Sequence, residues 1–176
     1  MKNNKLVVFY GPRNIGKTSL LMKVVPHLQQ SGFKVSGVIS PPVFRNQEKV
    51  GIQIQNIATG EIRNLAQRRQ ERYVQDATPG YAFDDRNLHW GDVVLKNAVP
   101  GQVLIIDELG PLEIKFGRGW QAGVKAVTSG EYDLCIVVLR EELHEMVRET
   151  WDVAAWVEFQ PTLDECCFDH YLIQNE

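Results

Sequence analysis

The stretch KLVVFYGPRNIGKTSLLMKVV, residues 5–25, joins two apolar segments through a short link that contains two glycines. Residues 5–10 form a continuous β-branched and aromatic run that ends at Gly11, which predicts a strand buried on both faces. Apolar residues recur at helical spacing after the link, which predicts a helix. Pro26 is expected to kink this helix or to end its first segment.

The link from Gly11 to Thr18, GPRNIGKT, fits the phosphate-loop pattern G-x-x-x-x-G-K-[ST] at every fixed position. Glycines let successive backbone amides face one anion, and the free amides of the following helix add positive potential. In this pattern Lys17 contacts the β and γ phosphates, and Thr18 offers its hydroxyl to Mg²⁺. The predicted nucleotide-binding residues are Gly11, Pro12, Arg13, Asn14, Ile15, Gly16, Lys17, Thr18 and Ser19.

A second polar cluster, DELGPLE at residues 107–113, follows the apolar run 103–106. A carboxylate at the end of a buried strand commonly holds the metal of a bound triphosphate, so Asp107 is predicted on the metal side, through a coordinated water. Glu108 is the candidate to orient or deprotonate an attacking water. Glu113 either contacts the same site or caps the next helix.

Phosphoryl transfer also needs positive charge near the transferred oxygens, and an added arginine accelerates it by ~10³- to 10⁵-fold. Arg13 lies inside the phosphate loop, and Arg140 follows the apolar run 134–139. Either could serve, although such arginines more often pair with surface carboxylates. The predicted catalytic residues are Lys17, Glu108 and Arg140.

Strands alternate with helices through most of the 176 residues, which predicts a single α/β domain over residues 1–176 with a mostly parallel sheet. An antiparallel hairpin insertion is expected at about residues 43–76, because residues 50–66 alternate apolar and polar around an ATGE turn. Further strands are predicted at 34–40, 102–107, 132–139 and 154–159, and helices at 84–99, 118–129, 141–149 and 162–173. For the last helix, Thr162 and Glu165 match a capping box.

Composition narrows the class of protein. A formal charge of -3 gives no global attraction to nucleic acid or to anionic membranes. The apolar runs are far shorter than the ~20 residues that a membrane helix needs. Three cysteines without framework spacing are interpreted as buried thiols of a cytoplasmic protein. The four histidines show no zinc-site spacing, so no structural metal is predicted.

Five segments together resemble the small P-loop nucleoside-triphosphatase family first described from thermophiles, which also has a vertebrate cancer-related member. They are GPRNIGKTSLL (11–21), GFKVSGVIS (32–40), VGIQIQNIATGE (50–61), GYAFDD (80–85) and DELGPLE (107–113). The resemblance implies a RecA-like three-layer sandwich and slow Mg²⁺-dependent hydrolysis of nucleoside triphosphates, ATP or GTP among them, to diphosphates. It also supports the roles given above to Gly16, Lys17, Thr18, Asp107 and Glu108.

Two other functions remain open from the sequence. In a small nucleotide or nucleoside kinase, Glu108 would activate a substrate hydroxyl in place of water, but such enzymes usually need an arginine-rich lid. In a nucleotide-binding adaptor of the molybdopterin guanine dinucleotide assembly type, the same phosphate loop would bind with little catalysis. A regulatory GTPase is disfavoured, because the chain contains no N-K-x-D guanine-reading motif.

Overall fold

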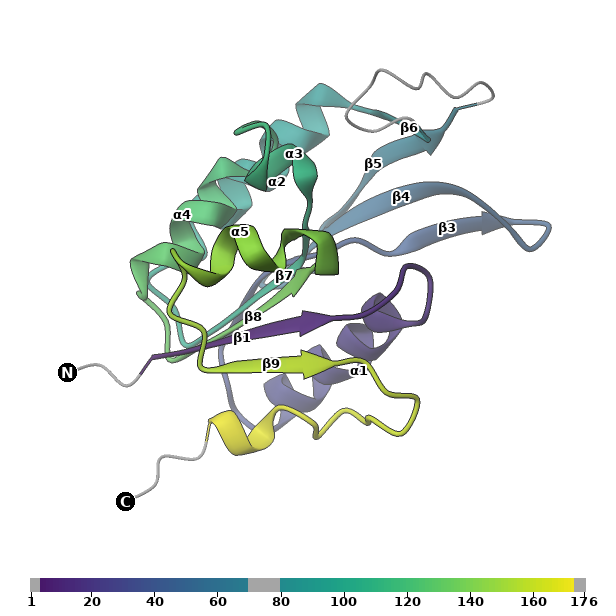
Figure 1. Cartoon of the computed structure of the whole chain (residues 1–176). Helices are drawn as coiled ribbons and strands as arrows, with labels where there is room; N and C mark the ends of the chain where they lie inside the picture. Colours follow the sequence, from purple (N-terminus) through teal and green to yellow (C-terminus); the bar gives the residue numbers. More distant parts are fainter. Residues whose placement is uncertain (1–3, 70–79, 173–176) are drawn as a thin grey trace.

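The computed structural model describes residues 4–69 and 80–172, which form one nine-stranded sheet covered by helices on both faces (Figure 1). The strand order is β6-β5-β4-β2-β7-β8-β1-β9, and β3 pairs with β4 outside this path. The strands are β1 (Lys5–Tyr10), β2 (Val35–Ile39), β3 (Pro42–Arg45), β4 (Glu48–Asn56), β5 (Ile62–Arg68), β6 (Tyr81–Phe83), β7 (Val103–Leu109), β8 (Leu134–Leu139) and β9 (Ala155–Glu158).

The five strands β2, β7, β8, β1 and β9 run parallel and form the centre of the molecule. Their side chains alternate between two cores, as expected for a sheet buried on both faces. From β1, Leu6 and Val8 enter the core under α2 and α4, whereas Val7 and Phe9 enter the core under α1. The predicted three-layer α/β sandwich is therefore confirmed.

The helices divide between these two faces (Figure 1). α1 (Lys17–Gln30) covers one face, together with the segment after β9. α2 (Asp85–Lys96), α3 (Pro111–Ile114), α4 (Gln121–Ser129) and α5 (His144–Arg148) lie on the other. α1 continues past Pro26, so the proline does not end it. No helix within residues 4–69 and 80–172 has the length and apolarity to span a bilayer.

α2 begins as predicted, since the Asp84 side chain accepts hydrogen bonds from the amides of Arg86 and Asn87. Gly91 weakens the helical pattern in the sequence, and the structure gives the reason for it. A Cβ at Gly91 would lie 2.5 Å from Ile54 Cδ1 and 2.7 Å from Trp120 Nε1. The glycine therefore lets α2 pack closely against the sheet and the start of α4.

The predicted hairpin insertion forms β4 and β5, and in the structure it is larger than predicted and joined to the main sheet. β4 pairs antiparallel with β2, so the hairpin continues the main sheet as an antiparallel wing, defined here as β3, β4, β5 and β6. The short strands β3 and β6 were not predicted. Residues 70–76 of the predicted insertion lie outside the described residues.

The helix predicted at 162–173 is wrong within its described part. Residues 161–172 form two separate turns followed by a short 3₁₀ helix, η2 (Asp169–Tyr171), in place of one continuous helix. The Asp164 carboxylate accepts a hydrogen bond from the Cys166 amide at 3.1 Å, a local bond that competes with helix formation. Phe168 is fully buried against Phe9, 5.5 Å away between ring centroids, and anchors the segment beside α1.

Candidate active site at the strand ends

The candidate site lies where four parallel strands end at one edge of the sheet. β1 leads into the phosphate loop, and β7 carries Asp107 and Glu108 near its end. β8 is followed by Arg140, and β2 ends just before Ser40. Ligands of open α/β sheets bind beyond the carboxyl ends of the strands, so the fold brings the sequence-predicted residues to the expected place.

The phosphate loop, residues 11–18, turns from β1 into α1 through left-handed backbone. The φ angle is +142° at Gly11, +60° at Asn14 and +111° at Gly16. Positive φ is costly for most residues and easy for glycine, which explains the two glycines of the motif. Gly16 is the N-cap of α1, whose first free amides follow the loop directly and carry the positive end of the helix dipole.

The Lys17 ammonium folds back over this loop. Its Nζ donates hydrogen bonds to the backbone oxygens of Gly11 at 2.9 Å and of Pro12 at 2.6 Å. Desolvation lowers the pKa of Lys17, while the charges of Glu108 and Asp107 act in the opposite direction. The ammonium group thus lies between carbonyl oxygens and carboxylates, where a bound phosphate would meet it.

Asp107 is the most buried carboxylate of the site and connects three elements. The Thr18 hydroxyl donates to its Oδ1 at 3.2 Å, and the Ser40 amide donates to its Oδ2 at 2.9 Å. The carboxyl side chain is only 3% exposed. A hydroxyl beside a carboxylate supplies the oxygen ligands that Mg²⁺ prefers, so Thr18 and Asp107 fit a divalent cation here.

Burial raises the pKa of Asp107 to about 6, although the hydrogen bonds from Ser40 and Thr18 oppose the shift. An acid whose folded pKa exceeds its unfolded value of about 4 binds more protons when folded. The protonated Asp107 side chain therefore stabilises the folded protein fully below about pH 4. This contribution to the free energy of unfolding disappears as the pH rises to about 6. At neutral pH the charged carboxylate destabilises the ligand-free protein.

We therefore expect Asp107→Asn to raise the free energy of unfolding of the ligand-free protein by up to about 3 kcal/mol near pH 7.5, and by about half of that near pH 5. Urea denaturation at the two pH values measures the difference. Asp133→Asn, at an exposed aspartate before β8, serves as the control and should change little. A lower free energy of unfolding for Asp107→Asn than for the parent protein near pH 7.5 would contradict the destabilising effect assigned to the charged carboxylate.

Glu108 lies beside Asp107 but points to a different partner. Its φ is +79°, an unusual value for a residue with a side chain, and the register of β7 against β8 shifts between Ile106 and Leu109. This irregular backbone directs the carboxylate toward Arg140, whose Nε donates to Glu108 Oε1 at 2.5 Å. Backbone strain of this kind costs about 1–3 kcal/mol and clusters at functional sites.

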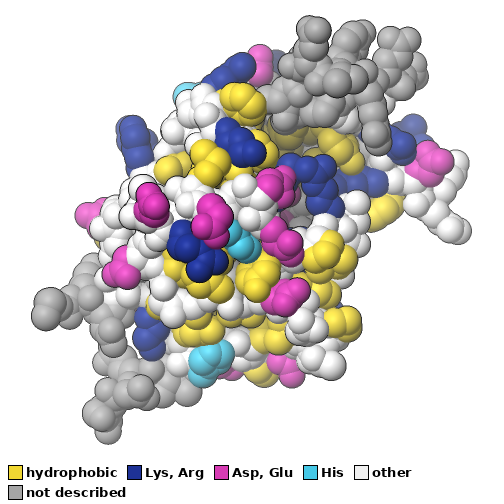
Figure 2. Space-filling model, in the orientation of Figure 1, with side chains coloured by type: hydrophobic (Ala, Val, Ile, Leu, Met, Phe, Trp, Pro, Cys, Tyr) yellow, Lys and Arg dark blue, Asp and Glu magenta, His cyan; other side chains and the backbone are white. Residues whose placement is uncertain are grey.

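The ion pair belongs to a longer row of charges. Arg140 Nη1 also lies 3.9 Å from Glu142 Oε1, and Arg13 Nη2 approaches the same oxygen at 3.9 Å. The Arg13 side chain is 70% exposed, so its pairing is weak. Figure 2 likewise shows Lys, Arg, Asp and Glu side chains interleaved on the viewed face. Glu108 and Glu142 therefore offset part of the positive charge of Arg140 and Arg13 beside the loop.

Glu113 caps a helix, which is the second of the two roles predicted for it. Its Oε2 accepts from the Gly110 amide at 2.9 Å and its Oε1 from the Trp120 amide at 3.1 Å. Desolvation raises the pKa of this carboxyl, and the two amides oppose the shift. Glu113 thus caps α3 and joins it to the start of α4. The exposed loop residues Arg13, Asn14, Ile15 and Ser19 each carry a backbone N–H that can donate to an anion, whereas Pro12, also exposed, has none.

The sequence did not point to Ser40, the residue that orients Asp107. Besides the amide hydrogen bond, its hydroxyl donates to the backbone oxygen of Asp107 at 3.4 Å. A usable signal was the abrupt end of the predicted strand 34–40 at two prolines, because a strand neighbouring β7 must end at the same edge. The pairing of β2 with β7 in the structure then places Ser40 beside Asp107.

Comparison with known proteins finds relatives described as nucleoside-triphosphatases. A family model described as NTPase matches residues 6–160. The nucleoside-triphosphatase THEP1 of Thermococcus kodakarensis is 30% identical over 138 residues, 74% of each chain. That of Methanopyrus kandleri is 31% identical over 142 residues, 80% of this chain and 77% of the relative. For the protein of Caldivirga maquilingensis, 33% identical over 106 residues, the match spans 60% of this chain and 58% of the relative.

Two solved structures share the fold. The solution structure of a human cancer-related nucleoside triphosphatase superposes with a TM-score of 0.69 and 22% identity, over 94% of this chain and 95% of that one. The crystal structure of THEP1 from Aquifex aeolicus gives a TM-score of 0.60 and 19% identity, over 89% and 90%. These likenesses confirm the predicted P-loop fold.

Proposed function

Because the chain belongs to the NTPase family, we propose that it hydrolyses nucleoside 5′-triphosphates, ATP or GTP among them, to diphosphate and phosphate with the help of Mg²⁺. The observation that carries this proposal is the hydrogen bond between Thr18 and Asp107 at 3.2 Å. It joins the end of the phosphate loop to the acid of β7, across 89 residues of sequence. The phosphate loop and the carboxylate proposed to bind the cation thus lie next to each other.

Different groups of the chain bind the phosphates and the cation. The loop amides and the first turn of α1 receive the phosphate oxygens, and Lys17 exchanges the carbonyl oxygens of Gly11 and Pro12 for phosphate oxygens. Thr18 and Asp107 would hold Mg²⁺, which neutralises negative charge on the phosphates when bound. Ser40 keeps the Asp107 carboxylate oriented toward Thr18.

Glu108 is the group proposed to orient water and accept its proton. Its hydrogen bond to Arg140 engages Oε1, and no donor among residues 4–69 and 80–172 hydrogen-bonds to Oε2. One carboxylate oxygen is therefore available for a water molecule while the other is fixed. Arg140 positions Glu108 and places a cation close to the site, where it would offset charge on the transferred phosphoryl group.

The test is phosphate release from ATP, GTP, CTP and UTP, each with and without Mg²⁺. We expect release of inorganic phosphate from at least one nucleotide without any acceptor, and its loss when EDTA removes the metal. Nucleotide binding without release would favour the adaptor function. Release that depends on an added hydroxyl acceptor would favour the kinase, and unchanged release in EDTA would overturn the assigned Mg²⁺ dependence.

A further inference from the structure

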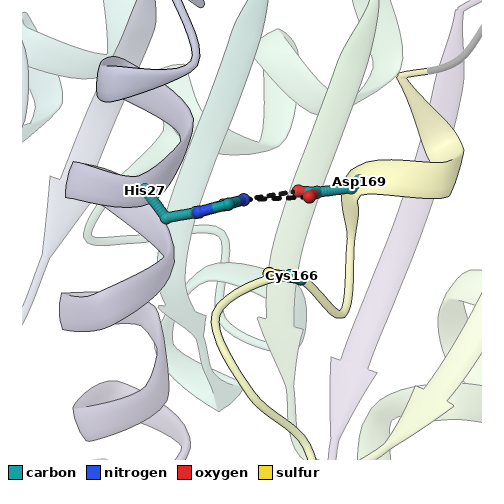
Figure 3. Close-up of side chains that lie close together, drawn as sticks. All are labelled: His27, Cys166 and Asp169. Atoms are coloured by element: carbon teal, nitrogen blue, oxygen red, sulfur yellow. Dashed lines mark hydrogen bonds and ion pairs between the residues drawn. The ribbon is translucent and has the colours of Figure 1, made fainter.

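Three side chains that the proposed hydrolysis does not use converge near the end of α1 that lies away from the phosphate loop. They are His27 in the last turn of α1 and Cys166 and Asp169 in the segment after β9 (Figure 3). One ligand atom from each lies within 4.8 Å of the other two. Among residues 4–69 and 80–172, this is the one group of three such side chains that could hold a metal ion.

We propose that His27, Cys166 and Asp169 form a binding site for Zn²⁺. Imidazole nitrogen, thiolate sulfur and carboxylate oxygen are the three ligand types that zinc uses in proteins. Binding forms one bond to each of them and releases the thiol proton of Cys166 to solvent. The thiolate and the carboxylate balance the two positive charges of the ion, and water completes a tetrahedral set.

The distances suit a tetrahedral ion after small side-chain rotations. His27 Nε2 lies 3.1 Å and 2.9 Å from the two oxygens of Asp169. Zinc bonds of about 2.0–2.3 Å keep ligand atoms roughly 3.3–3.8 Å apart. When zinc binds, the distance between His27 Nε2 and the Asp169 oxygens therefore increases slightly, and Cys166 Sγ moves roughly 1 Å closer to these atoms. Both side chains are partly exposed, His27 by 25% and Asp169 by 41%, so an ion has access.

The backbone that carries two of the ligands is already ordered. The Asp169 amide donates to the Cys166 oxygen at 3.0 Å, and the Asp164 side chain holds the Cys166 amide. This turn places residues three apart in sequence on the same side of the chain, facing α1. Between them, Phe168 is fully buried in the core under α1. The turns that replace the predicted C-terminal helix thus position both ligands.

This site is separate from the phosphate site. His27 follows Lys17 by ten residues in α1, which corresponds to roughly 15 Å along the helix axis. The thiolate also distinguishes the two sites, since Mg²⁺ prefers oxygen ligands. Zinc at this position would tie the C-terminal segment to α1 without touching the phosphate loop. Its expected effect is on stability and not on the chemistry at Asp107 and Glu108.

The test uses the full chain, freed of metal with EDTA and then titrated with Co²⁺ as a spectroscopic probe and with Zn²⁺ in competition. We expect one equivalent of Co²⁺ to give thiolate-to-cobalt charge-transfer absorption, which Zn²⁺ displaces and excess Mg²⁺ does not. Zn²⁺ should also raise the melting temperature. Absence of the charge-transfer band in the parent protein would overturn the proposal.

Cys166→Ser should abolish this absorption and weaken Zn²⁺ binding at least ~10-fold, and His27→Gln should weaken it similarly. The matched control is Cys167→Ser, because this neighbouring thiol packs against the core under α1 and should leave band and affinity unchanged. Circular dichroism checks that each variant is folded. Retention of the band in Cys166→Ser, or its loss in Cys167→Ser, would place the metal elsewhere.

Discussion

Lys17→Ala lowers phosphate release from a nucleoside triphosphate by at least ~10²- to 10³-fold, the effect expected when one preorganised charge donor is removed. The reason is geometric as well as electrostatic. The ammonium is held by the backbone oxygens of Gly11 and Pro12 at the mouth of the loop, and the phosphate-loop pattern predicts that Lys17 contacts the β and γ phosphates. Triphosphate binding, followed with a fluorescent nucleotide, should fall as well.

Two comparison variants make this result specific. Lys23→Ala removes an exposed lysine from the same helix and should leave phosphate release unchanged. Lys17→Arg keeps the charge but replaces a compact ammonium with a larger planar group, so it should restore little of the activity. Full activity in Lys17→Ala would show that the loop amides suffice and would remove Lys17 from its assigned role.

The parts of this site that were predictable from the sequence are those encoded locally. The glycine spacing of residues 11–18 specifies a turn between a buried strand and a helix, and the apolar run before Asp107 specifies a strand end. Both signals depend on neighbours in the chain and on little else. The parallel order of the central strands then places the two ends together, as the general rule for α/β sheets requires.

The parts that were missed depend on contacts between distant segments. Ser40 becomes important only because β2 pairs with β7, and the pairing of Arg140 with Glu108 depends on an irregular register in β7. The helix prediction for the C-terminal segment was wrong for a different reason. Its capping-box pattern favoured a helix, but burial of Phe168 and the local hydrogen bond of Asp164 outweighed that propensity.

Glu108 stands out because its local geometry is unfavourable and yet retained. A glutamate at φ +79° is less favourable than ordinary strand backbone, and the hydrogen bond from Arg140 to its carboxylate is one contact that favours the observed conformation. Relaxation would restore the alternation of β7 and turn the carboxylate away from Arg140. The strained backbone is therefore what keeps this carboxylate beside Asp107 at the strand ends.

Glu108→Gln should accordingly retain triphosphate binding while phosphate release falls by at least ~10²-fold, the lower end for loss of a general base. The amide keeps the size of the side chain and can still accept from Arg140, but it cannot take a proton from water. Single-turnover release and nucleotide binding, measured on the same protein, separate the two effects. Glu142→Gln neutralises the neighbouring acid, which lies 3.9 Å from Arg140, and should leave the rate nearly unchanged. If Glu108→Gln turned over as fast as the parent protein, the water would have to be activated without Glu108, and the strain at this residue would need another explanation.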